Sequence, residues 1–198
     1  EIYTLSLHDA LPIFDCGLGS CFFSNGIPHL GAQGFAGELG HTCVKPNGRQ
    51  CGCGNKGCLE TYCTEKGMIK TIKKLMAERN EPTMLSDLPK LNIRTITECC
   101  DKGDQIAIET LELTGNILGI GLANYASVLN PEAIILTGDL TIPGKWLLSP
   151  MRKAFEAHVF PNIRNTTRIL VSILNEGERD VLGASALAWD VKEYSLFT

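Results

Sequence analysis

Four side chains of the types that bind metal ions lie within eighteen residues: His41, Cys51, Cys53 and Cys58. Three thiolates and one imidazole form a closed tetrahedral zinc site, and the intervening glycines allow a tight backbone to wrap round one ion. The alternative is a set of free buried thiols, which behave as small hydrophobic side chains. The spacing favours a structural zinc site in which four protein ligands leave no position for water or substrate.

A carboxylate stands at each end of this metal-ligand string. Glu38 lies three residues before His41, and Glu60 lies two residues after Cys58. Ionised carboxylates form strong, charge-assisted hydrogen bonds with suitable donors. The alternative for Glu60 is a negative charge at the first turn of a helix, where it stabilises the helix dipole.

The whole string resembles the signature of the ROK family of bacterial sugar kinases and sugar-responsive repressors. That signature is Glu-x-Gly-His followed by Cys-x-Cys-Gly-x-x-Gly-Cys-x-Glu, and all of its fixed positions are present: Glu38, Gly40, His41, Cys51, Cys53, Gly54, Gly57, Cys58 and Glu60. The resemblance implies that Glu38, His41 and Glu60 bind a hexose. It also implies that one ring nitrogen of His41 binds zinc while the other donates to a sugar hydroxyl.

The resemblance further implies an α/β architecture, the actin-like ATPase fold with its ribonuclease-H-like core and a zinc-binding loop. Kinases of the family transfer the γ-phosphoryl group of ATP to a hexose such as glucose, with Mg²⁺ bridging the phosphates. The repressors place a DNA-binding domain before the same sugar-binding domain. Family members commonly dimerise, so a homodimer is one expected state. An unrelated zinc-binding interaction module would explain the cysteines but not the two carboxylates.

Nucleotide contacts are implied at two glycine turns. The family's second phosphate loop reads Gly-Thr-Gly-x-Gly-x-Gly, and Gly17 and Gly19 match it, whereas Cys16 and Cys21 replace the threonine and the last glycine. Backbone N–H groups in such a turn can cradle phosphates. The adenosine side of the family site carries a Gly-Gly pair. Here Gly138 keeps the first glycine, and Asp139 replaces the second. The changes at Cys16, Cys21 and Asp139 together favour a repressor slightly over a kinase.

Two further family segments do not occur in these 198 residues. They are the first phosphate loop, Asp-x-Gly-Gly-Thr, and the Asn-Asp segment whose aspartate is the catalytic base. We therefore interpret residues 14–198 as the C-terminal large domain of a ROK sugar kinase, without its small N-terminal domain and inactive by itself. Residues 1–13 fit nothing in the family, and we interpret them as a non-native leader.

Hydrophobic periodicity predicts the elements that position these groups. A strand–turn–strand unit is expected at 22–28 around Asn-Gly, and a helix over 64–80 shows one apolar stripe with three lysines on its outer face. Residues 82–96 look irregular apart from a short helix near Ser86. The longest helix is expected over 104–129, with interior glycines that allow close approach to a sheet. Strands are predicted at 133–136 and 168–174, and helices at 146–158 and 178–190, which implies parallel strands.

Composition excludes several classes of protein. A net charge of −4 gives no reason to expect nucleic acid as a partner of this chain. We found no apolar run near the ~20 residues of a membrane span. Nine cysteines without a secretory signal indicate a reducing, cytoplasmic environment.

Overall fold

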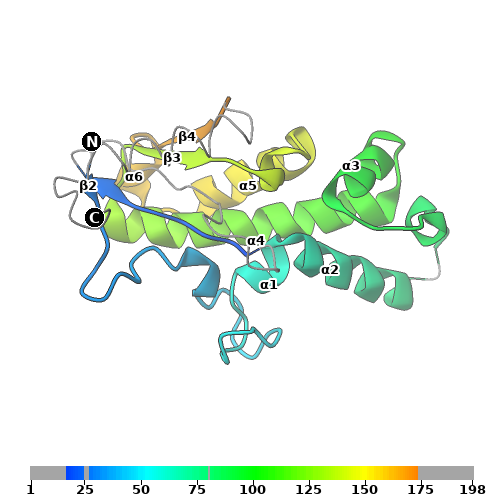
Figure 1. Cartoon of the computed structure of the whole chain (residues 1–198). Coiled ribbons are helices and arrows are strands. Elements are labelled where there is room, and N and C mark those ends of the chain that lie inside the picture. Colours follow the sequence, from blue (N-terminus) through cyan, green and yellow to red (C-terminus); the bar gives the residue numbers. More distant parts are fainter. Residues whose placement is uncertain (1–16, 25–26, 80, 174–198) are drawn as a thin grey trace, which may run out of the picture.

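The computed structural model describes residues 17–24, 27–79 and 81–173, and one long helix runs through the middle of this part (Figure 1). This helix, α4, spans Gln105–Leu129. Its N-cap Asp104 accepts a hydrogen bond from the backbone N–H of Ala107, as the sequence predicted. Asn130 ends it in the left-handed conformation with φ 48°, directly before Pro131, which cannot continue a helix.

One side of α4 carries the α/β part of the fold. Strand β3 (Ala133–Leu136) pairs in parallel with β4 (Arg168–Val171), and Ile134 lies opposite Ile169. The connection between them contains η3 (Asp139–Thr141), α5 (Lys145–His158) and α6 (Pro161–Arg164). The predicted parallel pairing is therefore confirmed. The helix expected at 178–190 lies outside the described residues.

The interior glycines of α4 allow two close helix contacts rather than an approach to the sheet. A Cβ at Gly115 would lie 2.6 Å from the carbonyl oxygen of Leu147 in α5, and one at Gly119 would clash with the carbonyl oxygen of Met151. A Cβ at Gly121 would lie 2.8 Å from the side chain of Leu59, next to the metal-ligand string. The expected partner was wrong because helix α5, and not a strand, covers this face of α4.

The opposite side of α4 carries α1 (Glu60–Cys63) and α2 (Glu65–Glu78). Met68 and Ile72 of α2 are fully buried, and the three lysines at 70, 73 and 74 are exposed, as predicted. The short helix near Ser86 is confirmed as η2 (Met84–Asp87).

Helix α3 (Ile93–Asp101) lies partly in the stretch that we expected to be irregular. Its start is hidden in the sequence because the capping box uses Thr95 in place of the usual Glu or Gln, with Asn92 as N-cap. Burial of one apolar face, which includes Ile96 and Cys100, overrides the low helix propensity of its β-branched residues.

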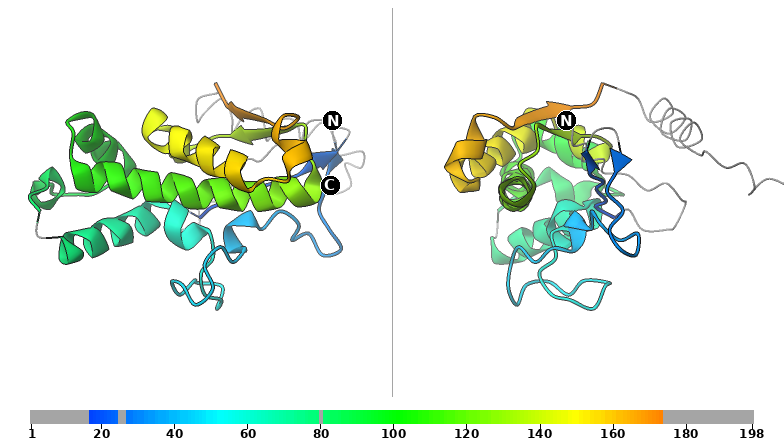
Figure 2. Two further views of the ribbon diagram at one scale, coloured as in Figure 1. Left: turned by 180° about the vertical axis from the view of Figure 1, so that it is seen from behind. Right: turned by 90° about the vertical axis from the view of Figure 1, so that its left-hand side faces the viewer.

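A hairpin forms the N-terminal edge of the described chain. Strands β1 (Phe23–Ser24) and β2 (Ile27–Pro28) are antiparallel, as predicted, and the turn itself lies outside the described residues. Phe22 stacks on Tyr125 of α4 with ring centroids 5.2 Å apart. After the hairpin comes η1 (Leu39–His41), and the loop over 42–59 then projects from the helical body in both views of Figure 2.

Helix α4 is long and apolar enough to cross a membrane, contrary to our expectation from the sequence. Its most apolar window has a mean hydropathy of 1.3, but 61% of that window is buried inside the structure. Core helices of soluble proteins pass the same test, so length and composition give only weak support for a membrane span.

Candidate metal centre and adjoining carboxylates

Close backbone packing fixes the segment that carries Glu38 and His41. A Cβ at Gly37 would lie 2.5 Å from the carbonyl oxygen of Ser20, and one at Gly40 would clash with the carbonyl oxygen of Leu18. Between these glycines, Leu39 is fully buried. The glycines therefore let η1 lie directly against residues 18–20, and the two polar side chains leave this turn in defined positions.

The loop over 42–59 folds back on itself through backbone hydrogen bonds. Cys43 lies opposite Cys58 and Gln50 opposite Lys56 in two isolated antiparallel bridges. A tight turn closes the tip, where the N–H of Cys51 donates to Asn55 at 2.9 Å and that of Gly54 donates to Cys51 at 3.2 Å. These contacts bring three cysteines that are separated in sequence to one side of the loop.

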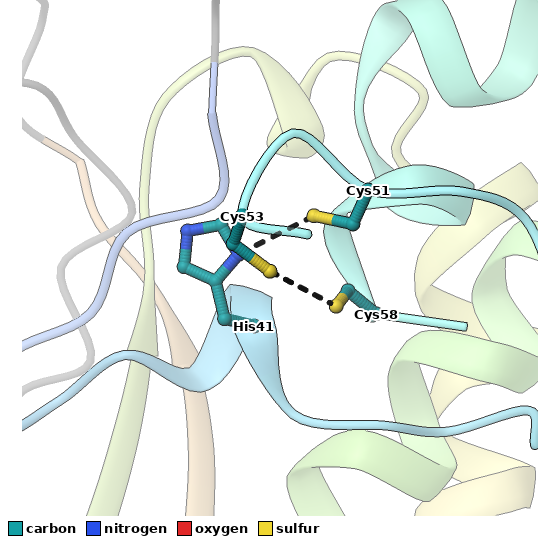
Figure 3. Close-up of side chains that lie close together, drawn as sticks. All are labelled: His41, Cys51, Cys53 and Cys58. Atoms are coloured by element: carbon teal, nitrogen blue, oxygen red, sulfur yellow. Dashed lines mark hydrogen bonds between the residues drawn. The ribbon is translucent and has the colours of Figure 1, made fainter. Parts of the chain in front are cut away.

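The four predicted metal ligands converge, as Figure 3 shows. Their ligand atoms lie within 4.8 Å of one another. Sγ of Cys51 is 3.5 Å from Nδ1 of His41, and Sγ of Cys53 is 3.7 Å from Sγ of Cys58. A tetrahedral zinc ion with ordinary bond lengths requires about 3.6 Å between sulfur and nitrogen and about 3.8 Å between two sulfurs. The arrangement therefore fits a four-coordinate zinc ion.

The three thiols differ in their surroundings. Burial is the main reason why the pKa of Cys51 is raised to about 12, and burial also raises the pKa of Cys58. Cys53 is exposed, and a hydrogen bond from the backbone at Asn55 is the main cause that lowers its pKa. Metal binding to thiols at this site displaces protons, because the thiolate is the ligand.

The two carboxylates adjoin opposite nitrogens of the His41 ring. Oε2 of Glu38 lies 3.7 Å from Nε2, and Oε1 of Glu60 lies 3.6 Å from Nδ1. Nδ1 is also the nitrogen that faces the sulfur of Cys51, so Nε2 is the one on the open side of the cluster. The side chain of Glu38 is 57% exposed and that of Glu60 is 21% exposed, which leaves both carboxylates accessible to a small polar ligand.

The segment that contains Gly17 and Gly19 borders this group of residues, and over 17–20 it forms no turn, contrary to the prediction. A Cβ at Gly17 would lie 3.8 Å from Oε2 of Glu60, within van der Waals contact. Gly19 follows in the same extended segment and is half-buried. The structure therefore brings the first two glycines of the predicted phosphate loop to the neighbourhood of the Glu60 carboxylate.

Gly138 belongs to a different part of the fold, at the carboxyl end of strand β3. Its φ of 75° and ψ of −164° lie in a region that is essentially restricted to glycine. Loops at the carboxyl ends of parallel strands commonly form ligand sites in open α/β sheets. Asp139 begins the short helix η3 directly after it.

Sequence reasoning missed the part that Arg49 plays in this site. Its guanidinium lies over the ring of Tyr62, 4.6 Å from the centroid, and donates hydrogen bonds to helices α1 and α2, which follow the loop over 42–59. The sequence shows a single arginine inside a glycine-rich loop between two metal ligands. Its acceptors are mainly backbone carbonyl groups, which every residue has, so the sequence does not indicate which residues it contacts.

A Cys₃His cluster that could hold a metal ion, flanked by two carboxylates, is thus set on a unit with parallel strands. The sequence matches the profile of the ROK family over residues 12–191, and the chain belongs to that family.

Both branches of the family contain close relatives. The chain is 31% identical to the glucokinase of Halalkalibacterium halodurans over 181 residues, and 32% identical to the DNA-binding transcriptional dual regulator NagC of Escherichia coli over 171 residues. These matches cover 89% and 86% of the chain, but 54% and 41% of the relatives. The chain therefore spans about half the length of the curated relatives it matches.

A solved structure of a ROK glucokinase supports the same fold. The Streptomyces griseus glucokinase in complex with glucose and AMPPNP is 27% identical and superimposes with a TM-score of 0.78. The match covers 94% of this chain and 59% of that enzyme.

Proposed function

We propose that this chain is the sugar-binding part of a ROK sugar kinase most like a bacterial glucokinase. The observation that carries the proposal is the convergence of Glu38, His41 and Glu60 beside one metal-ligand cluster, with Gly17 adjoining Glu60. The whole protein would transfer a phosphoryl group from ATP to a hexose such as glucose in the cytoplasm.

The carboxylates supply acceptors for sugar hydroxyl groups. Each charge-assisted hydrogen bond of this kind contributes about 1.5–3 kcal/mol. Nε2 of His41, on the open side of its ring, would donate to a further hydroxyl, because a zinc ion bound at Nδ1 would leave the ring proton on Nε2. Three groups in fixed positions would bind the hydroxyl pattern of a hexose ring and hold it in one orientation.

Zinc, held by His41 and the three cysteines, would supply structural cross-linking of the loop and no reaction step, since four protein ligands complete its coordination. The chain's own contribution is the placement of Glu60. This residue follows Cys58 by two positions and begins helix α1. Anchoring of the cysteine therefore fixes the position of the carboxylate.

Nucleotide binding would use backbone groups at the two glycine segments, around Gly17 and Gly19 and around Gly138. We assign the β- and γ-phosphates of ATP, with Mg²⁺, to the backbone around Gly17 and Gly19, and the adenosine to Gly138. The adjacency of Gly17 and Glu60 supports this assignment, because sugar and terminal phosphate must meet for transfer. The Asn-Asp segment of the family is not in these 198 residues, so we propose that they do not catalyse phosphoryl transfer by themselves.

A sugar-sensing ROK repressor is the second candidate. Cys16, Cys21 and Asp139 occupy positions that the family phosphate and adenosine turns fill with threonine and glycine, and the chain is 32% identical to NagC. Both candidates bind a sugar at the same carboxylates, and they differ in whether ATP binds as well.

Calorimetric titration separates the two candidates. The kinase assignment predicts that the purified chain, loaded with zinc, binds both glucose and the ATP analogue AMPPNP in the presence of Mg²⁺. The repressor assignment predicts binding of a sugar, tested with glucose and N-acetylglucosamine, without binding of AMPPNP. If neither sugar binds at millimolar concentrations, the carboxylates of this site have another ligand and both candidates are wrong.

A further inference from the structure

The guanidinium of Arg49 connects the metal loop to the two helices that follow it. Nη1 donates to the carbonyl oxygens of Thr61 and Gly67, both at 2.8 Å, and Nη2 donates to Oγ1 of Thr71 at 2.9 Å. The cation also lies over the ring of Tyr62, 4.6 Å from its centroid. One side chain from the loop therefore contacts α1, through Thr61 and Tyr62, and the first half of α2, through Gly67 and Thr71.

The backbone of Arg49 is held equally firmly within the loop. Its N–H donates to the hydroxyl of Tyr62 at 3.0 Å, and its carbonyl accepts from the N–H of Gly57 at 2.7 Å. A side chain at Gly48 would clash with the same tyrosine hydroxyl. Because both ends of Arg49 are fixed, the residue is a rigid link between the loop and helix α1.

The acceptors of this guanidinium are neutral, so it holds α1 and α2 in place through hydrogen bonds and not through an ion pair. We call this set of contacts the Arg49 clamp. Burial lowers the pKa of Arg49, yet arginine stays charged in proteins and needs its donors satisfied. The planar fork of an arginine can serve several acceptors and stack on a ring at once, which the compact ammonium of lysine cannot do. The arrangement therefore depends on arginine in particular.

Glu60 lies between two anchors. On one side, two residues before it, is the metal ligand Cys58; on the other side, one residue after it, is Thr61, whose carbonyl binds Arg49. Helix α1 has only four residues, and a single helical turn is not stable by itself. The orientation of Glu60 is therefore set by its neighbours and not by the helix.

We infer that Arg49 is a positioning residue, which together with the metal ligands sets the carboxylate of Glu60 against His41 for sugar binding. The inference rests on the proposed sugar site for its functional consequence. Its structural part does not depend on sugar binding. Without the guanidinium, the α1 turn opens while the metal centre stays intact, because the groups that accept hydrogen bonds from Arg49 are not metal ligands.

The test compares Arg49→Lys and Arg49→Met with Lys56→Met. Lys56 is an exposed cation in the same loop, so its replacement removes one positive charge without touching the clamp. Thr71→Val removes one acceptor of the guanidinium, together with the hydrogen bond from Oγ1 to the carbonyl of Gly67, and provides a milder variant should the arginine replacements fold poorly. For each protein, zinc content, amide hydrogen exchange and glucose affinity are measured on the whole 198-residue chain.

The informative amides are those of Thr61, Tyr62 and Cys63, which donate to Cys58 and Leu59 within the α1 turn. We expect their exchange to accelerate by about tenfold or more in Arg49→Met, in part in Arg49→Lys and Thr71→Val, and not in Lys56→Met. We expect glucose affinity to fall about tenfold in Arg49→Met with one zinc per chain retained. A merely structural role would lower zinc content, stability and all ligand affinities together.

Unchanged exchange at these three amides in Arg49→Met would overturn the inference. So would faster exchange with full glucose affinity, because the turn would then be irrelevant to the site. If the unaltered chain does not bind glucose, the sugar assignment fails, and the exchange rates still decide whether Arg49 holds the α1 turn.

Discussion

The carboxylate oxygen Oε1 of Glu60 lies 3.6 Å from Nδ1 of His41, although the whole metal loop separates the two residues in sequence. The same oxygen lies 2.9 Å from Sγ of Cys51. The carboxylate that we propose for sugar binding therefore lies directly beside two of the candidate metal ligands. Any change in the loop that moves Cys58 also moves Glu60, so metal binding and sugar binding are expected to be coupled.

Metal analysis of the purified chain is expected to give about one zinc per molecule. Cys53→Ser removes one of the four ligands and should abolish stoichiometric zinc, because an oxygen in place of the thiolate weakens a structural site severely. Cys43→Ser is the matched control, since Cys43 is an exposed thiol in the same loop outside the ligand group. Full zinc content in Cys53→Ser would show that the cluster binds metal in another way.

Removal of zinc with a chelator should loosen the loop and not the helical core. Apparent binding energies of structural zinc reach about 10 kcal/mol, and the loop over 42–59 otherwise depends on two isolated bridges and a few turn hydrogen bonds. Proteolysis is therefore expected first in this loop after chelation. Cleavage within α4 before cleavage in the loop would contradict this order.

Gly119→Ala should destabilise the protein, although alanine is the better helix former by about 1 kcal/mol. The added Cβ would lie 2.7 Å from Cβ of Ala154 and 2.9 Å from the backbone nitrogen of Phe155, both in α5. Overpacking of this kind costs about 1–3 kcal/mol, and urea unfolding measures it. Asn124→Ala, at an exposed position of the same helix, is the control and should be neutral or slightly stabilising.

The predictable parts of the fold and site were those marked by local chemistry. Four metal-ligating residues at metal spacing, an Asp N-cap and an Asn before Pro each indicate one structure whatever surrounds them. Helix α3 was missed because the burial of Ile96 and Cys100 decides it, and burial depends on the rest of the chain. The clamp of Arg49 was missed for a similar reason, since two of its acceptors are carbonyl groups of Thr61 and Gly67.

Glu60→Gln tests the sugar site most directly, because it keeps the shape of the side chain and removes its charge. We expect glucose affinity to fall by about 1.5–3 kcal/mol, the contribution of one charge-assisted hydrogen bond. Zinc content should be unchanged, because Glu60 is outside the Cys₃His ligand group. Calorimetric titration with glucose on the zinc-loaded chain measures the difference, and Glu112→Gln, at an exposed position of α4, controls for the loss of one negative charge.

Cys58→Ser should behave differently from Glu60→Gln. Loss of this ligand should lower zinc content, stability and glucose affinity together. Cys58 lies only two residues before Glu60, so the metal bond to Cys58 also fixes the position of Glu60. The contrast between the two variants separates a ligand-binding carboxylate from a structural one. Normal glucose binding by Glu60→Gln, accompanied by a lower melting temperature, would assign Glu60 to the dipole of helix α1 and would move the sugar site elsewhere.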